Sequence, residues 1–158
     1  MRLVLAAFAL ALAACSPAST GTAQSAQSAA AVLPVSGLDV IPLTVIRGTR
    51  RLAFKVEVAR GPIEQGRGLM FRTALAPDEG MVFPMNPPRM AGFYMRNTVI
   101  ALDIIFVGPD GRILNIAANA VPYDETSLRS AGPVKAVLEL NGGRTAELGI
   151  VPGDKVEW

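Results

Sequence analysis

Apolar and polar residues alternate along the middle of the chain. From residue 52 to residue 58, apolar side chains at every second position alternate with a set that includes Lys55 and Glu57. This period of two predicts a half-buried strand that turns Lys55 and Glu57 away from the core. Because an apolar stretch at 43–46 comes before it and Arg47-Gly48-Thr49-Arg50 separates the two, we predict a β-hairpin.

The second half of the chain adds further strands. Residues 99–107 are apolar at every position except Asp103, which predicts a central strand covered on both faces. Turn residues follow it at 108–111. The same approach predicts strands at 112–118, 134–140 and 155–158, and short helices at 62–69 and 143–148. We therefore predict a single mainly-β domain, a β-sandwich or squashed barrel of the jelly-roll type, with one or two short helices.

The N-terminal part of the chain has a different pattern. Arg2 precedes an uninterrupted apolar run at 3–13, which has the length of a signal-peptide core and is too short for an ordinary transmembrane helix. The run ends in Leu12-Ala13-Ala14-Cys15, which resembles the lipobox of bacterial lipoproteins, where small residues precede a cysteine that is lipidated and freed by cleavage. The alternative is a plain secretory signal in which Cys15 is incidental.

This resemblance implies a location and a division of the chain. We expect a signal peptide at 1–14, a lipidated N-terminus and flexible linker at 15–36, rich in Ser, Ala, Thr and Gln, and a folded domain at 37–158. Ser16 stands where an aspartate would resemble an inner-membrane retention signal. The expected location is therefore the periplasmic face of the cell envelope, with the lipid anchor in the outer membrane.

Composition narrows the chemistry of this domain. The chain has no histidine, and Cys15 is its only cysteine, so triad hydrolases, zinc hydrolases and internal disulfides are excluded. Lys and Arg number 15 against 13 Asp and Glu, and they form no cluster, so we expect no nucleic-acid partner. We expect no cofactor, and binding in preference to catalysis.

Four sequence blocks resemble a known family. In chain order they are Arg67-Gly68-Leu69-Met70-Phe71-Arg72, residues 80–83, residues 94–98 with 102–106, and residues 137–143. Over residues 50–157 they resemble an uncharacterised family catalogued as domain of unknown function 192. The resemblance implies a compact β-sandwich or jelly-roll domain, often secreted or lipid-anchored, and implies no activity. The chain departs from the family at Tyr94, where tryptophan is usual, and in a proline-rich insertion at 84–88.

Two acids in apolar strands are candidate site residues. Asp103 shares a face with Ala101 and Ile105, and Glu139 lies between two leucines. A buried carboxyl group must be paired, hydrogen-bonded or protonated. On neighbouring strands the two acids would make an acid/base pair of the glycosidase kind. The simpler alternative is that both accept hydrogen bonds that fix loop geometry.

A second polar set lies near the family blocks. Arg67, Arg72 and Arg96 offer planar donor groups suited to carboxylates or phosphates, and Asn97 and Thr98 follow the last of them. Tyr94 would stack on a sugar ring or, given its apolar neighbours, pack in the core. The candidate ligand-binding residues are therefore Arg72, Tyr94, Asn97, Asp103 and Glu139.

Five methionines, Met70, Met81, Met85, Met90 and Met95, fall between residues 70 and 95. Thioethers are soft ligands suited to Cu(I), but methionine also fills irregular cores. We favour the core, and assign no metal ligand, because three of the five belong to the family blocks. For copper, Met85 and Met90 on the proline-rich segment would have to be exposed.

Three functions fit these observations. The first is a non-enzymatic binding module for a small polar ligand or an envelope polymer such as a glycan. The second is an assembly protein that contacts an envelope partner through the proline-rich loop at residues 84–90. The third is a carboxylate-based glycan hydrolase, which would need Asp103 and Glu139 across one cleft.

Overall fold

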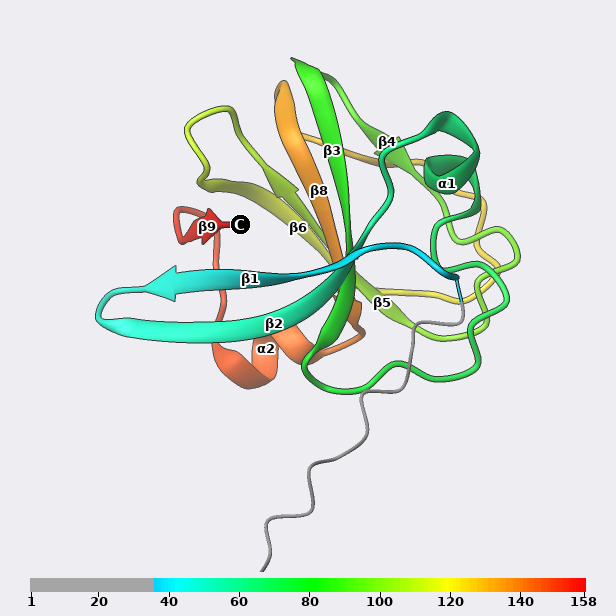
Figure 1. The fold of residues 1–158 in the computed structure, drawn as a ribbon, viewed down its shortest axis with the longest axis horizontal. Coiled ribbons are helices and arrows are strands. Elements are labelled where there is room, and N and C mark those ends of the chain that lie inside the picture. Colours follow the sequence, from blue (N-terminus) through cyan, green and yellow to red (C-terminus); the bar gives the residue numbers. More distant parts are fainter. Residues whose placement is uncertain (1–35) are drawn as a thin grey trace, which may run out of the picture. The chain divides into compact units, whose positions relative to one another are not determined.

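The structure, a computed structural model, describes residues 36–158 (Figure 1). The predicted signal peptide, Cys15 and most of the linker lie outside this range. The elements are β1 (Val40–Arg47), β2 (Arg50–Val58), α1 (Pro62–Arg67), β3 (Glu79–Arg89), β4 (Gly92–Phe93), β5 (Leu102–Val107), β6 (Ile113–Ala120), β7 (Leu128–Arg129), β8 (Val134–Asn141), α2 (Arg144–Leu148) and β9 (Lys155–Glu157). The predicted mainly-β class is confirmed.

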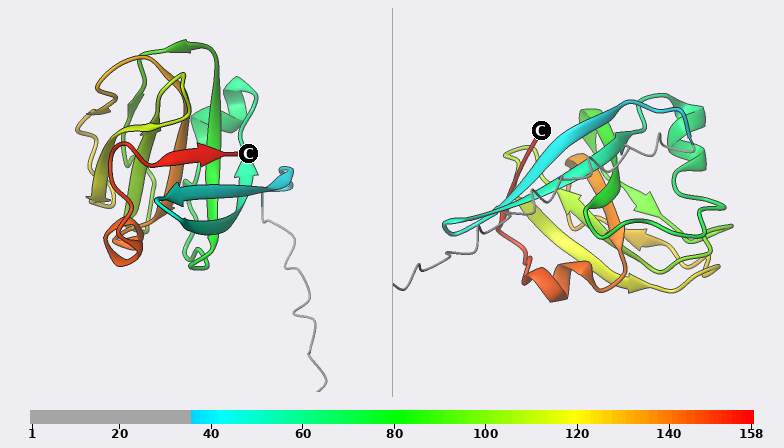
Figure 2. Two further views of the ribbon diagram at one scale, coloured as in Figure 1. Left: turned by 90° about the vertical axis from the view of Figure 1, so that its left-hand side faces the viewer. Right: turned by 60° about the horizontal axis from the view of Figure 1, so that its bottom comes forward.

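Seven of the strands form one mixed sheet in the order β6-β5-β8-β3-β2-β1-β9, and β4 and β7 form a separate ribbon. Within the large sheet, β2 and β3 run parallel and the other neighbours run antiparallel. A single bridge between Arg112 and Lys155 links the two ends of this sheet, which is not closed into a barrel. Figure 2 shows the strong twist that brings the β1–β2 hairpin across the other strands.

Side chains alternate between two cores on the two faces of the sheet. Val82, Leu138 and Ile105 are cross-strand neighbours on β3, β8 and β5, and they belong to a first core that also contains residues of β1 and β9. The next row belongs to a second core, which contains Met81 and Ile104. This second core is covered by residues 69–75 and the β4–β7 ribbon, on the side of the sheet where α1 lies in Figure 1. We call these the hairpin-side core and the ribbon-side core.

Most predicted elements are present. The hairpin forms β1 and β2 with Gly48 and Thr49 in the turn. The strand expected at 99–107 is β5, which begins at Leu102, lies between β6 and β8, and is buried at every residue. The helix expected at 62–69 is α1, where the Glu64 carboxylate accepts hydrogen bonds from the backbone N–H groups of Arg60 and Gly61. These bonds lower the pKa of Glu64.

Two expectations were wrong. The proline-rich segment at 84–88 is not a loop, because it belongs to β3, whose pairing with β8 is interrupted between Pro84 and Arg89. Prolines cannot donate to a ladder, so an irregular strand end accommodates them. Glu57 is buried, because the chain after α1 covers the outer face of β2.

In residues 36–158 no helix has the length and apolar character needed to cross a membrane.

Candidate functional site

A row of four side chains crosses the ribbon-side face of the sheet. Glu57 on β2 is the register partner of Met81 on β3, Met81 is the partner of Glu139 on β8, and Glu139 is the partner of Ile104 on β5. Neighbouring strands lie about 4.8 Å apart, so the two glutamate backbones are separated by about 10 Å. The ribbon-side core thus contains two carboxyl groups with Met81 between them.

Glu139 lies at a pocket of about 290 Å³, which we call the Glu139 pocket. Its walls come from the end of α1, the exposed end of β3, the β4 ribbon and the segment after α1. The apolar lining consists of Leu69, Met70, Phe83, Met85, Met90, Ala91, Phe93 and Tyr94, and the polar lining includes Gln65, Arg67, Arg89, Thr98 and Glu139. The lining that residues 36–158 provide is therefore mixed, polar and apolar in similar measure, and it includes one carboxyl group.

Within the part of the chain that the structure describes, the Glu139 side chain has no compensating partner. The residue is 5% exposed, and its Oε2 atom is shielded from solvent without a hydrogen-bond partner among residues 36–158. Its cross-strand neighbours, Met81 and Ile104, are apolar. Burial alone raises the pKa of Glu139 from 4.5 to about 8. At neutral pH the group is a protonated acid that can donate a hydrogen bond.

Aromatic rings give the pocket a stable wall. Phe93 of β4 packs edge-on against Phe83, with ring centroids 5.0 Å apart, and against Phe106, at 6.3 Å. Gly68, at the end of α1, has φ 49°, and a Cβ there would lie 3.3 Å from the Phe83 ring. Glycine thus permits both the turn and the close approach of the backbone to the ring.

Charged groups lie at the edge of this pocket. Arg67 and Arg89 are both exposed and line it, and Arg89 donates a long hydrogen bond of 3.5 Å to Gln65. Tyr94 is 43% exposed, and the guanidinium of Arg96 lies 5.2 Å from its ring centroid. The expectation that Tyr94 packs in the core was wrong, since its ring lies at the surface.

Glu57 is the buried acid that the sequence pattern missed. It is 6% exposed and forms an ion pair with Arg72 and a hydrogen bond with the hydroxyl of Ser36. The apolar Ala59, which shares its face and is fully buried, was the available signal. Arg72 thus has an internal partner, and it lines a separate hollow of about 50 Å³.

The segment between Arg67 and Arg72 separates the two hollows, because Arg67, Gly68 and Met70 line both. Phe71 in this segment has φ 64°, a strained value for a non-glycine residue, and its N–H donates to the carbonyl of Asn97 at 2.8 Å. Asn97 is exposed and donates a weak contact of 3.9 Å to the sulfur of Met70. Asn97 therefore supports the pocket wall from outside.

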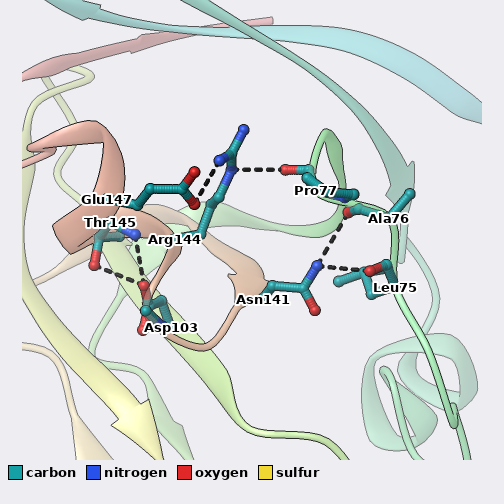
Figure 3. Close-up of polar contacts among 9 residues, drawn as sticks. Leu75, Ala76, Pro77, Asp103, Asn141, Arg144, Thr145 and Glu147 are labelled. Carbon is teal, nitrogen blue, oxygen red and sulfur yellow. Dashed lines mark hydrogen bonds and ion pairs between the residues drawn. The ribbon is translucent and has the colours of Figure 1, made fainter.

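Asp103 lies in a different environment, on the hairpin-side face opposite Leu140. Figure 3 shows its carboxylate beside Thr145 at the start of α2. Its Oδ1 accepts hydrogen bonds from the backbone N–H groups of Asn119 (2.8 Å) and Gly143 (2.9 Å). Its Oδ2 accepts from the N–H and the hydroxyl of Thr145, both at 2.7 Å. Four donors compensate this fully buried carboxylate, which thereby holds the start of α2 against β5 and β6.

Neighbouring polar side chains extend this anchoring (Figure 3). The Asn141 side-chain amide donates to the carbonyls of Leu75 and Ala76, at 2.7 and 3.1 Å. Arg144 donates to the carbonyl of Pro77 at 2.9 Å and forms an ion pair with Glu147. Asn141, in the family block at 137–143, and Arg144, directly after that block, thus fasten the connection before β3.

The predicted site residues therefore separate into three groups. Glu139 and Tyr94 line one pocket, whereas Arg72 and Asn97 lie beside it and make internal contacts. Asp103 is on the opposite face of the sheet, because its partner Leu140 is the residue next to Glu139. Successive strand residues point to opposite faces, so the predicted pairing of Asp103 with Glu139 is wrong.

The methionines divide in the same way. Met81 and Met95 are 1% exposed members of the ribbon-side core, as expected. Met70, which was also expected in the core, is half-buried and lines the Glu139 pocket with Met85 and Met90. The expectation that copper binding needs both Met85 and Met90 exposed at the surface is met by Met90, at 59%, and not by Met85, at 6%. Met85 instead lines the pocket, so it is reached from there and not from the outer surface.

Comparison with known proteins identifies relatives of this chain. The family model DUF192, described as an uncharacterized ACR, matches residues 44–158. A protein of unknown function from Novosphingobium aromaticivorans, known from a crystal structure, has 63% sequence identity to this chain and a TM-score of 0.78. The match covers 87% of this chain and 99% of that one. A putative transcription regulator from Sinorhizobium meliloti is 39% identical, with a TM-score of 0.74 and coverages of 76% and 94%. No curated protein matches the chain.

Proposed function

This chain belongs to the DUF192 family, and from that premise and the pocket geometry we propose that its folded domain is a binding module for a small polar ligand. The supporting observation is the Glu139 carboxyl group, which is buried without a partner at an open pocket. Burying a polar group without a hydrogen bond costs about 1 to 3 kcal/mol. A ligand that supplies the missing bond recovers this energy.

The dimensions of the pocket limit the ligand. A volume of about 290 Å³ is at the lower end of the range for small-molecule sites. It suits a small molecule, or the terminal unit of an envelope polymer whose remaining part stays outside. The face of a long polymer would need an extended groove instead.

The lining sets the chemistry of the ligand. The protonated Glu139 carboxyl group can donate one hydrogen bond and accept another, and it ionises against a cationic group. The rings of Phe83 and Phe93 suit an apolar body. The guanidinium groups of Arg67 and Arg89 suit an anionic group at the pocket edge. A small zwitterion with an apolar side chain meets all three requirements.

The same geometry does not support a glycan hydrolase. Such enzymes place two carboxyl groups on either side of the scissile bond, about 5 to 10 Å apart. Among residues 36–158, Glu139 is the only acid that lines the pocket. Glu57 is paired with Arg72, and Asp103 faces the other side of the sheet. Binding without catalysis is therefore the proposed role.

A thermal-shift screen of the full chain tests this proposal. We expect small aromatic amines and zwitterions to raise the melting temperature, because a ligand at 100 times its Kd stabilises the folded state by about 2.7 kcal/mol. Glu139→Gln should weaken the shift, whereas Glu147→Gln, at an exposed acid on α2, should leave it unchanged. A shift of equal size in both variants would place the ligand elsewhere.

We further propose that the domain works in the cell envelope, tethered through Cys15. The support is the lipobox-like sequence Leu12-Ala13-Ala14-Cys15 after an apolar run. Membrane fractionation and labelling with a radioactive fatty acid test it. The unmodified chain should be labelled and sediment with membranes, and Cys15→Ser should do neither. Labelling of both proteins, or of neither, would contradict lipidation at Cys15.

One observation favours a second candidate, an assembly role. Pro87, Pro88 and Met90 lie at the exposed end of β3 and offer an apolar contact. If this segment binds an envelope protein, Pro88→Ser should reduce cross-linking to that protein while the ligand-induced thermal shift persists. Unchanged cross-linking would exclude the segment as the contact.

A further inference from the structure

Three of the five clustered methionines line one pocket. Met70 follows α1, Met85 lies in β3 and Met90 lies in the connection to β4, and all three line the Glu139 pocket. The other two, Met81 and Met95, do not line it and are 1% exposed. The five methionines that are clustered in the sequence thus divide into two core residues, Met81 and Met95, and three residues that line the Glu139 pocket.

The donors of this pocket suit one class of metal ion. Thioethers are soft, neutral ligands that select Cu(I) over harder ions. Glu139 adds one carboxyl oxygen without a partner. Within residues 36–158, no group of three or more His, Cys, Asp or Glu side chains is placed to hold a harder metal ion. The Glu139 pocket therefore offers soft sulfur and one oxygen.

Charge balance points to a monovalent ion. An isolated charge in an apolar site is costly unless it is compensated. The negative charge of one ionised carboxylate cancels the positive charge of one Cu(I) ion. The Glu139 carboxylate and the bound ion together therefore have no net charge. A divalent ion would leave an unbalanced positive charge next to Arg67 and Arg89.

We propose that the Glu139 pocket binds one Cu(I) ion through the sulfur atoms of Met70, Met85 and Met90 and the carboxylate of Glu139. This inference rests on the proposed binding function, since it names a ligand for the same pocket. Met90, at 59% exposure, takes the ion from solvent, and Met85, at 6%, holds it inside. The contact of Asn97 with the Met70 sulfur orients that ligand.

Binding displaces a proton. The proton of the buried Glu139 carboxyl group passes to solvent when the carboxylate bonds to the ion. No electron is transferred, because copper enters and stays as Cu(I).

The test is anaerobic competition against a chromogenic Cu(I) chelator, with the full chain carrying Cys15→Ser so that the thiol does not contribute. We expect one bound Cu(I) per chain, and a loss of about tenfold or more in affinity for each of Met70→Leu, Met85→Leu and Met90→Leu. Leucine conserves volume, so these variants keep the pocket wall. Met81→Leu and Met95→Leu are matched controls and should bind as tightly as the parent chain.

A second measurement needs no variant at these positions. Titration with Ag(I), a redox-stable analogue, should shift the methyl NMR signals of Met70, Met85 and Met90 and leave those of Met81 and Met95 in place. No retained copper, or equal shifts for all five methyl groups, would overturn the inference.

The outcomes separate this inference from the proposed function. Met85→Leu keeps the Glu139 carboxyl group and the apolar wall, so an organic ligand found by thermal shift should still bind while Cu(I) is lost. If Cu(I) fails to bind but Glu139→Gln abolishes the shift with an aromatic amine, the copper site is wrong and the binding module stands. If neither copper nor any small ligand binds, both are wrong.

Discussion

Asp103 and Glu139 are two buried acids on adjacent strands of one sheet, and their surroundings are opposite. Asp103 accepts four hydrogen bonds on the hairpin-side face, whereas the Oε2 atom of Glu139 has no partner on the ribbon-side face. Both are at most 5% exposed. The two acids are therefore buried to a similar degree, and they differ in the hydrogen bonds that their carboxyl groups accept. A compensated acid stabilises the fold, and an uncompensated acid beside an open pocket is available to a ligand.

The largest effect expected from this comparison is that of Asp103→Asn. Asparagine has the same shape but loses the charge and turns an NH2 group toward donors that need acceptors. We expect the free energy of unfolding to fall by about 4 kcal/mol, measured by urea denaturation. A loss below about 1 kcal/mol would mean that water or movement of α2 replaces these bonds.

The strand pattern located both acids but not their roles. In each case an acid interrupts an apolar run, which is enough to predict burial. The donors to Asp103 are backbone groups of Asn119, Gly143 and Thr145, brought together only by tertiary pairing. Which face an acid occupies depends on the register with its neighbours. Here the pairing of Asp103 with Leu140 and of Ile104 with Glu139 decides it.

Other features lay beyond the sequence pattern for related reasons. Strand β3 contains Pro84, Pro87 and Pro88, which hide its alternation, although it is the strand that joins the two halves of the sheet. Glu57 occupies one of the alternate positions of β2 that the sequence pattern predicts to be exposed. Arg72, from a segment distant in the sequence, covers it. Short-range patterns thus predicted the regular strands, and long-range packing determined the pocket.

The second prediction concerns the pH dependence of stability. The pKa of Glu139 is about 8 in the folded chain and 4.5 when unfolded. Between these values the folded state holds the additional proton, so the free energy of unfolding decreases as pH rises, and the full stability is present below pH 4.5. At pH 7 the lost stability is about 3 kcal/mol.

Glu139→Gln has no such proton and should lose this slope. Urea denaturation of both proteins from about pH 5 to about pH 8 measures the difference. The acids with lowered pKa values, such as Glu64 and Glu157, are unchanged in the variant, so they cancel in the comparison. Parallel curves would show that the Glu139 carboxyl group is compensated after all.

A third prediction tests the close packing of the backbone beside Glu139. A Cβ atom added at Gly80 would lie 2.5 Å from the carbonyl oxygen of Glu139 and 2.8 Å from a methyl carbon of Leu140. Gly80→Ala must therefore separate β3 from β8, and we expect a loss of about 2 kcal/mol by urea denaturation. Gly66→Ala in α1, where nothing lies within 4 Å of the added Cβ, should not be destabilising.

The smallest expected effect on stability comes from two buried threonines, one on each face of the sheet, that allow the two faces to be compared. Thr145 is 3% exposed, and its hydroxyl donates to the charged Asp103 carboxylate at 2.7 Å. Thr98, which lines the Glu139 pocket, is 4% exposed, and its hydroxyl donates to the neutral carbonyl of Arg96 at 3.3 Å. Valine replaces either side chain with nearly the same shape.

Thr145→Val should cost about 1.5 kcal/mol, because a hydrogen bond to a charged group is stronger than one between neutral groups. Thr98→Val should cost less than about 1 kcal/mol, because its bond is long and neutral. Equal losses in urea denaturation would mean that the ionised carboxylate gives Thr145 no advantage. A larger loss for Thr98→Val would reverse the comparison, since it would place the polar interactions that stabilise the fold at the pocket.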